Sequence, residues 1–154
     1  MALGSLGPFR SGTTWCALLL AVALLSGASA GCSRVRGVSR CRALADMVNQ
    51  ALDAVEAATS EPKPGAKGYR TASTHYAALA KELEGFDPER PELKESLAEL
   101  ADVARSAKEQ TALLSDALAN GNRVTKLTAE RELERLAKRQ KTVTQRIEKT
   151  CSGH

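Results

Sequence analysis

The sequence is poor in aromatic residues and in histidine, and both shortages restrict its function. Phe, Trp and Tyr make up 3% of the 154 residues, and the chain has two histidines. Proteins that bind single-stranded nucleic acid stack bases on aromatic side chains, so we expect no nucleic-acid partner. Because His75 and His154 are the only imidazoles, no histidine-based acid–base pair is expected either.

Motifs that hold phosphates, metals or redox centres are also missing. The chain has no glycine-rich phosphate loop, no His-Glu-x-x-His and no Cys-x-x-Cys. Residues 151–154 have a Cys-x-x-His spacing, but a structural zinc site needs two further ligands. We therefore predict a non-enzymatic protein with no catalytic residues, no metal and no cofactor.

Alternating runs of apolar and polar residues are absent as well, so no β-strand is expected. Hydrophobic residues instead recur at intervals of three and four, and the composition is rich in Ala, Leu, Glu, Lys and Arg. Both features are typical of amphipathic helices. The sequence therefore predicts an all-α protein.

The first 31 residues have the layout of a secretory signal peptide. Arg10 supplies a positive charge, residues 16–25 are apolar, and residues 26–31 are small. The apolar segment is about half as long as the roughly 20 residues that cross a bilayer. We expect residues 1–31 to be a signal peptide that is removed on export.

Two cleavage sites are compatible with this signal. Ala28-Ser29-Ala30 would release a soluble protein that starts at Gly31. Ser29-Ala30-Gly31-Cys32 resembles the lipobox of bacterial lipoproteins, although Ser29 replaces the usual leucine-type residue. This resemblance implies that Cys32 is the first mature residue and carries a lipid. Ser33, in place of an aspartate, then implies the outer membrane.

The number of cysteines gives separate support for lipidation. Cys32, Cys41 and Cys151 follow the signal, and an odd thiol in an exported protein needs an explanation. If Cys32 carries lipid, Cys41 and Cys151 remain as one pair in an oxidising compartment.

Residues 32–39 form a basic segment, which we interpret as a lipidated tether that precedes a helical domain over residues 40–154. The arginines of the tether either contact anionic lipid head groups or remain solvated. A first helix is expected from Ser39 as its N-cap, with this apolar stripe: Cys41, Leu44, Val48, Ala51, Val55 and Ala58. Two prolines and two glycines in residues 61–68 end it.

A second helix is predicted over residues 69–85, with Ala72, Tyr76, Leu79, Leu83 and Phe86 on its apolar stripe. His75 lies beside this stripe, so we expect it on the surface. A turn follows at residues 87–91, and Pro91 suits the first position of the next helix.

Residues 91–150 predict two long helices folded back at Asn120-Gly121-Asn122. The first arm has a heptad stripe: Leu93, Leu97, Leu100, Ala104, Ala107, Thr111, Leu114 and Leu118. The second arm has another: Ala129, Leu133, Leu136, Gln140, Val143, Ile147 and Cys151. Gly121 offers a left-handed position, and Asn122 offers a cap for the second arm.

Four helices with short connections predict an antiparallel four-helix up-down bundle with a long C-terminal helical hairpin. A heptad stripe is also compatible with a coiled coil between chains. Because the other apolar stripes need a partner within the chain, we favour the bundle, and a monomer.

The two ends of this bundle have different predicted roles. In an up-down bundle, the start of the first helix and the end of the fourth share one end, which predicts a disulfide between Cys41 and Cys151. At the other end, the hairpin tip would extend about 10–15 Å beyond residues 61–68. Residues near this tip are candidates for contact with a protein partner, unless residues 61–68 cover them: Leu113, Leu114, Leu118, Val124 and Leu127.

Charge is unevenly distributed along the chain. Residues 43–122 hold 8 basic and 14 acidic side chains, whereas residues 123–154 hold 9 basic and 4 acidic ones. The basic fourth helix either pairs with acidic helices of the same bundle or faces an anionic surface.

The export signal and the helical character together resemble small Ala/Leu/Glu-rich helical lipoproteins of Gram-negative bacteria. This resemblance implies a membrane-anchored envelope lipoprotein, held by lipid on Cys32, that serves as an interaction or structural module. It would lie at the outer membrane, facing the periplasm or the cell surface. The alternative is a soluble periplasmic or secreted helical protein that binds ligands or acts as a chaperone.

Overall fold

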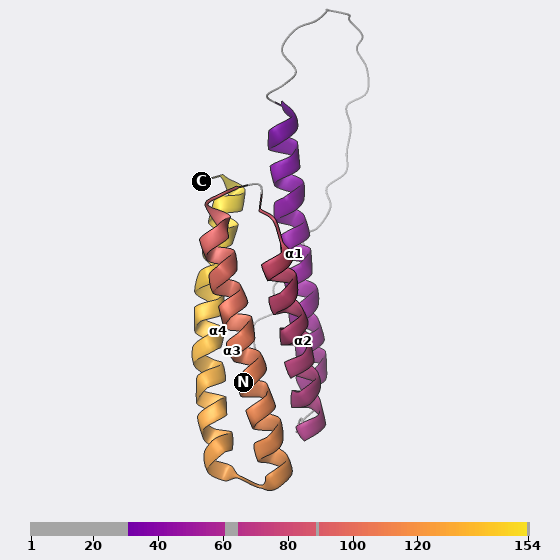
Figure 1. Ribbon diagram of the computed structural model, residues 1–154, viewed down its shortest axis with the longest axis vertical. Coiled ribbons are helices and arrows are strands. Elements are labelled where there is room, and N and C mark those ends of the chain that lie inside the picture. The colour runs from indigo at the N-terminus through magenta and orange to yellow at the C-terminus, as the bar shows by residue number, and fades with distance from the viewer. Residues whose placement is uncertain (1–30, 61–64, 89, 154) are drawn as a thin grey trace, which may run out of the picture.

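The computed structural model describes residues 31–60, 65–88 and 90–153, with side chains from residue 39 onward, and it contains four helices (Figure 1). They are α1 (Gly31–Thr59), α2 (Ala66–Gly85), α3 (Leu93–Asn120) and α4 (Arg123–Ser152). These described residues form no strand, so the all-α prediction is confirmed. The expected signal peptide lies outside the described residues, apart from Gly31.

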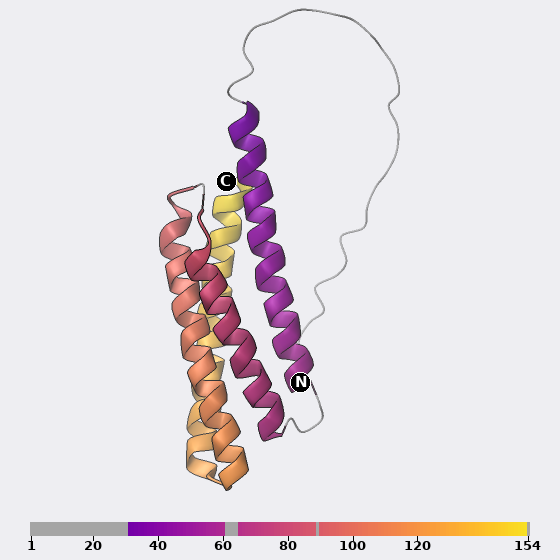
Figure 2. The same cartoon turned by 45° about the vertical axis from the view of Figure 1, so that its right-hand side comes forward.

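The helices lie side by side along one long axis and form a helical bundle (Figures 1 and 2). Helix α2 packs against both α1 and α3, and α3 packs against α4. By contrast, α1 touches α4 over a short stretch that includes a disulfide. The two helices diverge away from this point, as the turned view shows (Figure 2).

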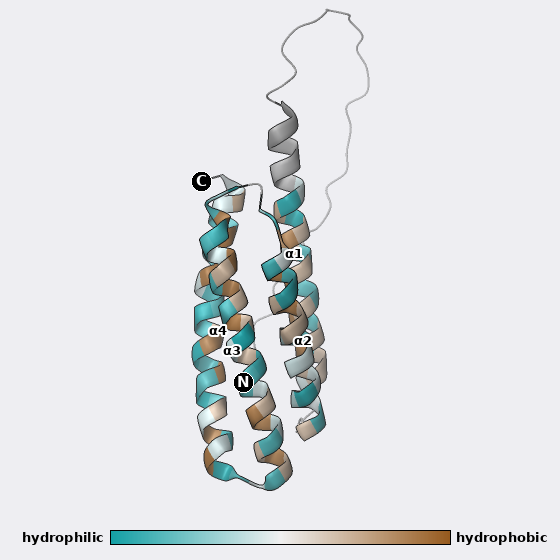
Figure 3. Cartoon of the chain, viewed as in Figure 1, coloured by the Kyte–Doolittle hydropathy of each residue, from teal (hydrophilic) through white to brown (hydrophobic). Residues whose placement is uncertain are grey.

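The apolar stripes expected from the sequence form the core. Apolar and polar segments alternate along the coloured part of each helix (Figure 3). In α3, seven of the eight expected heptad residues are buried: Leu93, Leu97, Leu100, Ala104, Ala107, Thr111 and Leu114. This chain's own helices therefore cover most of the heptad stripe, as a bundle requires.

The first helix begins earlier than predicted. We expected a non-helical tether over residues 32–39 and an N-cap at Ser39, but α1 runs without a break from Gly31. Extending an existing helix by one residue costs far less than nucleating a new one. Residues 32–39 contain no proline, and Gly37 costs the helix about 1 kcal/mol relative to alanine. Nothing in this segment therefore stops the helix, and its basic composition was not a sign of a non-helical tether.

The third helix begins two residues later than expected. Pro91 was predicted at the first helical position, but α3 starts at Leu93. Pro91 lies in a turn, in which the amide of Leu93 donates to the carbonyl of Arg90 at 3.0 Å. Because the fixed φ of proline suits a turn as well as a first helical turn, the sequence did not distinguish them.

The hairpin between α3 and α4 has the predicted turn chemistry. Gly121 has φ 68°, a left-handed conformation that suits glycine. The amide of Asn122 donates to the carbonyl of Ala117 at 2.9 Å, which closes the end of α3. The Asn122 side chain accepts from the amide of Thr125 at 3.1 Å and caps α4.

Candidate functional site

A disulfide between Cys41 and Cys151 links the first and last helices. The two sulfurs are 2.09 Å apart, the Cα atoms are 5.8 Å apart, and 110 positions separate the residues in sequence. Both cysteines are half-buried and pack against the main core. The predicted pairing is confirmed, because the two apolar stripes place both sulfurs on the inner face of the bundle.

Two arginine side chains near the disulfide hold the α2–α3 connection at the same end of the bundle. The guanidinium of Arg90 donates to the carbonyl of Thr150 in the last turn of α4. The guanidinium of Arg40 lies 6.0 Å from the centre of the Phe86 ring, at the outer limit of a cation–π contact.

At the opposite end, the hairpin tip exposes three of the five apolar residues named as partner candidates. The exposed fractions are 46% for Leu113, 76% for Val124 and 44% for Leu127. Leu118 is half-buried. These four residues belong to the last turns of α3 and the first turns of α4, as expected.

Leu114 is not part of this surface. It is 1% exposed and belongs to the interior, which corrects its place among the candidates. Its neighbour Ser115 donates a 2.8 Å hydrogen bond to the carbonyl of Ala66, so the first turn of α2 lies level with it. Helix α2 begins three residues earlier than expected.

The early start of α2 also shortens the projecting tip. From Ser115, five more residues of α3 continue beyond the level of Ala66, which is about 8 Å of helix. We expected 10–15 Å. Residues 61–64 lie outside the described residues, so the alternative that they cover the tip stays a prediction.

A long hollow, here called the α1–α4 slot, opens where α1 and α4 diverge. Its larger part has a volume of about 610 Å³ and its smaller part, beside the disulfide, about 280 Å³. Gln140 is a lining residue of both parts. Apolar residues from all four helices form most of the walls: Leu44, Val48, Leu52, Val55, Tyr69, Tyr76, Leu100, Val103, Leu114, Leu133, Leu136 and Ile147.

The charged residues that line the slot all have the same sign. Glu130, Glu134 and Glu148 are the charged groups among its described lining residues, with no lysine or arginine. Glu130 forms an ion pair with Lys126 at 3.3 Å. The slot therefore has an acidic lining, although it borders the most basic helix.

Two tyrosines from α2 line the larger part of the slot. Burial raises the pKa of Tyr76 and of Tyr69, and the carboxylate of Glu130 raises the pKa of Tyr69 further. The ammonium of Lys126 lowers the pKa of Tyr69 in part. Tyr69 is therefore within electrostatic reach of α4 across the slot, and both phenols stay protonated near neutral pH.

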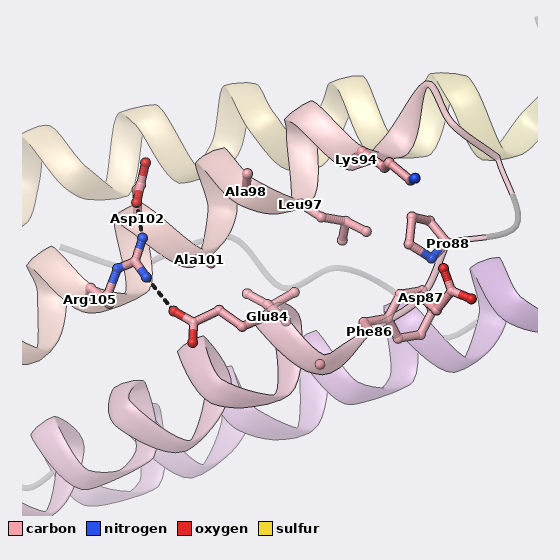
Figure 4. A pocket seen from close by; sticks show the side chains of 12 residues that line it. Glu84, Phe86, Asp87, Pro88, Lys94, Leu97, Ala98, Ala101, Asp102 and Arg105 are labelled. Atoms are coloured by element: carbon pink, nitrogen blue, oxygen red, sulfur yellow. Dashed lines mark hydrogen bonds and ion pairs between the residues drawn. The ribbon is translucent and has the colours of Figure 1, made fainter.

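A second hollow of about 460 Å³ lies between the end of α2 and the start of α3 (Figure 4). Arg105 lies between the carboxylates of Glu84 and Asp102 and pairs with both. A hydrogen bond from its guanidinium to Asp102 raises the pKa of Arg105, and Glu84 adds to the effect. Arg105 therefore offsets part of the negative charge of these two carboxylates, and its own guanidinium is already paired.

The α3–α4 interface pairs acidic with basic side chains. Glu99 accepts hydrogen bonds from Arg139 at 3.0 Å and from Arg146 at 2.9 Å. The bond from Arg139 is the main cause of the lowered pKa of Glu99, and Arg146 contributes to it. The predicted pairing of the basic fourth helix within the bundle holds for these two arginines.

The described side chains contain no group of three or more His, Cys, Asp or Glu residues that could hold a metal ion. His75, expected on the surface, is half-buried and lines a small hollow between α1 and α2. The prediction of a non-enzymatic protein is not tested by these observations and stays a prediction. Within the described part of the chain, no helix combines the length and apolarity that a membrane span requires.

Sequence reasoning missed the slot, although two signals for it were present. Tyr69 and Tyr76 are seven residues apart on α2, so they lie on one side of that helix. Gln140 interrupts the apolar stripe of α4, and it lines both parts of the slot. Comparison with known proteins gives no further guide, since no protein family, curated protein or solved structure matches the chain.

Proposed function

We propose that the four helices alternate in direction, as an antiparallel up-down bundle with a long C-terminal hairpin. Contacts between α2 and α3 support this arrangement. Ala66 is bonded to Ser115, and seven residues later in α2, Ser73 is bonded to the carbonyl of Lys108, seven residues earlier in α3. The bridge from Cys41 near the start of the bundle to the end of α4 agrees with it.

We propose that this protein is a non-enzymatic, membrane-anchored envelope lipoprotein that serves as an interaction or structural module. The Cys41–Cys151 disulfide is the observation that carries the proposal. Such bonds persist in exported proteins, and a cysteine in a disulfide has no second partner. Three cysteines follow Gly31, so Cys32 remains as the residue that the lipobox resemblance marks for lipid.

This anchor would give the bundle a direction. Cys41 is nine positions after Cys32, and α1 is continuous over this stretch, which corresponds to about 14 Å of helix. The lipid would therefore lie beyond the disulfide end, and the hairpin tip would face away from the membrane. The exposed Leu113, Val124 and Leu127 support a protein contact at that outer end.

Metabolic labelling with palmitate tests the anchor. Cells that produce the full chain should yield labelled protein in the membrane fraction, and Cys32→Ser should lose the label. Cys41→Ser with Cys151→Ser is the matched cysteine control and should keep it. Mass spectrometry that finds an unmodified N-terminus at Gly31 would overturn the lipid anchor.

Affinity capture from solubilised membranes tests the tip. Val124→Glu with Leu127→Glu should reduce recovery of the captured protein by about tenfold or more, if these side chains form the centre of an interface. Thr128→Glu, which adds charge at an exposed polar position of the same helix, is the control. Equal recovery with the double variant and the wild type would exclude the tip as the contact.

The alternative is a soluble periplasmic or secreted protein that binds ligands or acts as a chaperone. The α1–α4 slot favours this alternative, because apolar cavities of about 300–1,000 Å³ are typical of small-molecule sites. Unlabelled protein that fractionates with the soluble periplasmic material would support the alternative over the anchored lipoprotein.

A further inference from the structure

We propose that the α1–α4 slot binds one extended aliphatic chain that carries a cationic head group. The inference rests on the shape of the slot and on its acidic lining. It does not depend on lipid at Cys32 or on a partner at the hairpin tip, so it can hold for an anchored or a soluble protein.

The slot is apolar because two helices leave parts of their inner stripes uncovered. In α1, Leu52 and Val55 are half-buried, and in α4 Leu133 is half-buried and Ala137 is exposed. These residues line the slot, whereas a closed bundle would bury such positions by contact between the two helices. A ligand that fills the slot removes this apolar surface from water, which is the main source of its affinity.

The dimensions of the slot fit an extended chain. Its lining runs along α4 from Glu130 to Cys151, which is about 32 Å of helix. An acyl chain in one leaflet of a bilayer spans about 15 Å, half of the hydrocarbon core, so one chain fits with room to spare. The floor is formed by α3, through Leu100, Val103 and Leu114.

The acidic lining determines the head group. Glu134 and Glu148 form no ion pair with another described side chain, whereas Glu130 is paired with Lys126. An anionic head would be repelled by these carboxylates, whereas a cationic head is attracted. Tyr69 and Tyr76 also line the larger part of the slot, and aromatic rings are favourable neighbours for a cation.

Displacement of the uncharged fluorescent probe N-phenyl-1-naphthylamine measures this preference. Dodecyltrimethylammonium, kept below its micelle concentration, should displace the probe at a concentration at least about tenfold lower than dodecyl sulfate. The chain as a whole has a formal charge of +4, so non-specific attraction would favour the sulfate instead. Preference for the sulfate, or no displacement by either amphiphile, would overturn the proposal.

A matched pair of tryptophan variants locates the site. Ala137→Trp places a large ring in the slot and should weaken displacement by dodecyltrimethylammonium about tenfold or more. Ala98→Trp fills the hollow between α2 and α3 and should leave displacement by dodecyltrimethylammonium unchanged. Melting curves of both variants establish that they fold. Equal binding by the Ala137→Trp variant would exclude the slot as the site.

Charge reversal tests the head group separately. Glu134→Lys with Glu148→Lys should remove the preference for dodecyltrimethylammonium and shift it toward dodecyl sulfate, with probe binding retained. An unchanged preference in this variant would contradict the role of the acidic lining. A basic amphipathic peptide is a third competitor. If it displaces the probe and neither amphiphile does, the slot binds a helix and the proposal is wrong.

Discussion

The interface between α2 and α3 and the interface between α1 and α4 are stabilised in different ways. The first has hydrogen bonds along its length, from Ser73 to the carbonyl of Lys108 and from Ser115 to the carbonyl of Ala66. Ion pairs between Arg70 and Asp116 and between Glu84 and Arg105 add to it. The second consists of one covalent bond with a short contact around it, and a slot opens beyond that point.

This difference shows that a disulfide can take the place of packing between two helices. A covalent bond at one end holds α1 near α4 without requiring that their side chains interlock further along. Helix α1 still buries Leu44 and Val48 against the rest of the bundle, so its position does not depend on α4 alone. The inner surface near the middle of α1 remains accessible as a result.

Among the changes that test this difference, removal of the disulfide should have the largest effect on the unfolding free energy. Cys41→Ser with Cys151→Ser opens a loop of 110 residues, for which the chain-entropy model gives about 4–5 kcal/mol as an upper value. We expect a loss of unfolding free energy close to this value in urea titrations, with α1 amides exchanging with solvent before those of α2 and α3.

The reduced wild-type protein is the matched control and should behave like the double variant. A loss below about 1 kcal/mol, or uniform exchange over all four helices, would show that packing rather than the bond holds α1 in place.

The next largest effect should come from enlarging an alanine at the packed interface. Ala80 lies on the same side of α2 as Ser73 and Glu84, both of which contact α3, and it is 4% exposed. Ala80→Leu should cost about 1–3 kcal/mol of unfolding free energy because the side chain has no room. Ala137→Leu adds the same atoms in the slot and should change the unfolding free energy by less than about 0.5 kcal/mol. Equal losses in thermal melts would mean that the slot is closed in solution.

Removing a hydrogen bond between helices should have a smaller effect. Ser115→Ala loses the bond to the carbonyl of Ala66 and should lower the unfolding free energy by about 1 kcal/mol. Thr144 lines the slot, and its hydroxyl bonds only within α4, to the carbonyls of Gln140 and Lys141. Thr144→Val should therefore change stability by less than about 0.5 kcal/mol in the same urea titration, and a larger effect would indicate a contact across the slot.

The smallest expected effect concerns pH and the α3–α4 interface. Because Arg139 and Arg146 lower the pKa of Glu99 below its ordinary value of 4.5, the carboxylate stabilises the folded state above pH 4.5. This contribution is lost as the pH falls through the lowered pKa. Glu99→Gln should cost about 0.5 kcal/mol at pH 7 and less at pH 3, as measured by urea titration at both values.

Glu134→Gln is the control for this titration, since Glu134 forms no ion pair with another described side chain. A difference between wild type and Glu99→Gln that stays constant from pH 7 to pH 3 would show that charge does not contribute to the effect.

Local features were predictable from the sequence, and features set by the relative placement of helices were not. The roles of Gly121 and Asn122 follow from backbone chemistry, and the Cys41–Cys151 pair follows from two apolar stripes and short connections. The level that the start of α2 reaches along α3 is shown by the bond between Ser115 and Ala66, and a loop sequence leaves this start open by several residues. The slot depends on the angle between α1 and α4, which the apolar spacing does not encode.

The position of the disulfide has a mechanical consequence. The bond joins residues that lie near the two ends of the described chain, so a pulling force applied to α1 before Cys41 and to the residues after Cys151 passes through the sulfurs. The helices between them bear little of this load. Reduction under tension would release about 370 Å of extended chain, because the two cysteines are 110 positions apart in sequence, and force spectroscopy can measure this step directly.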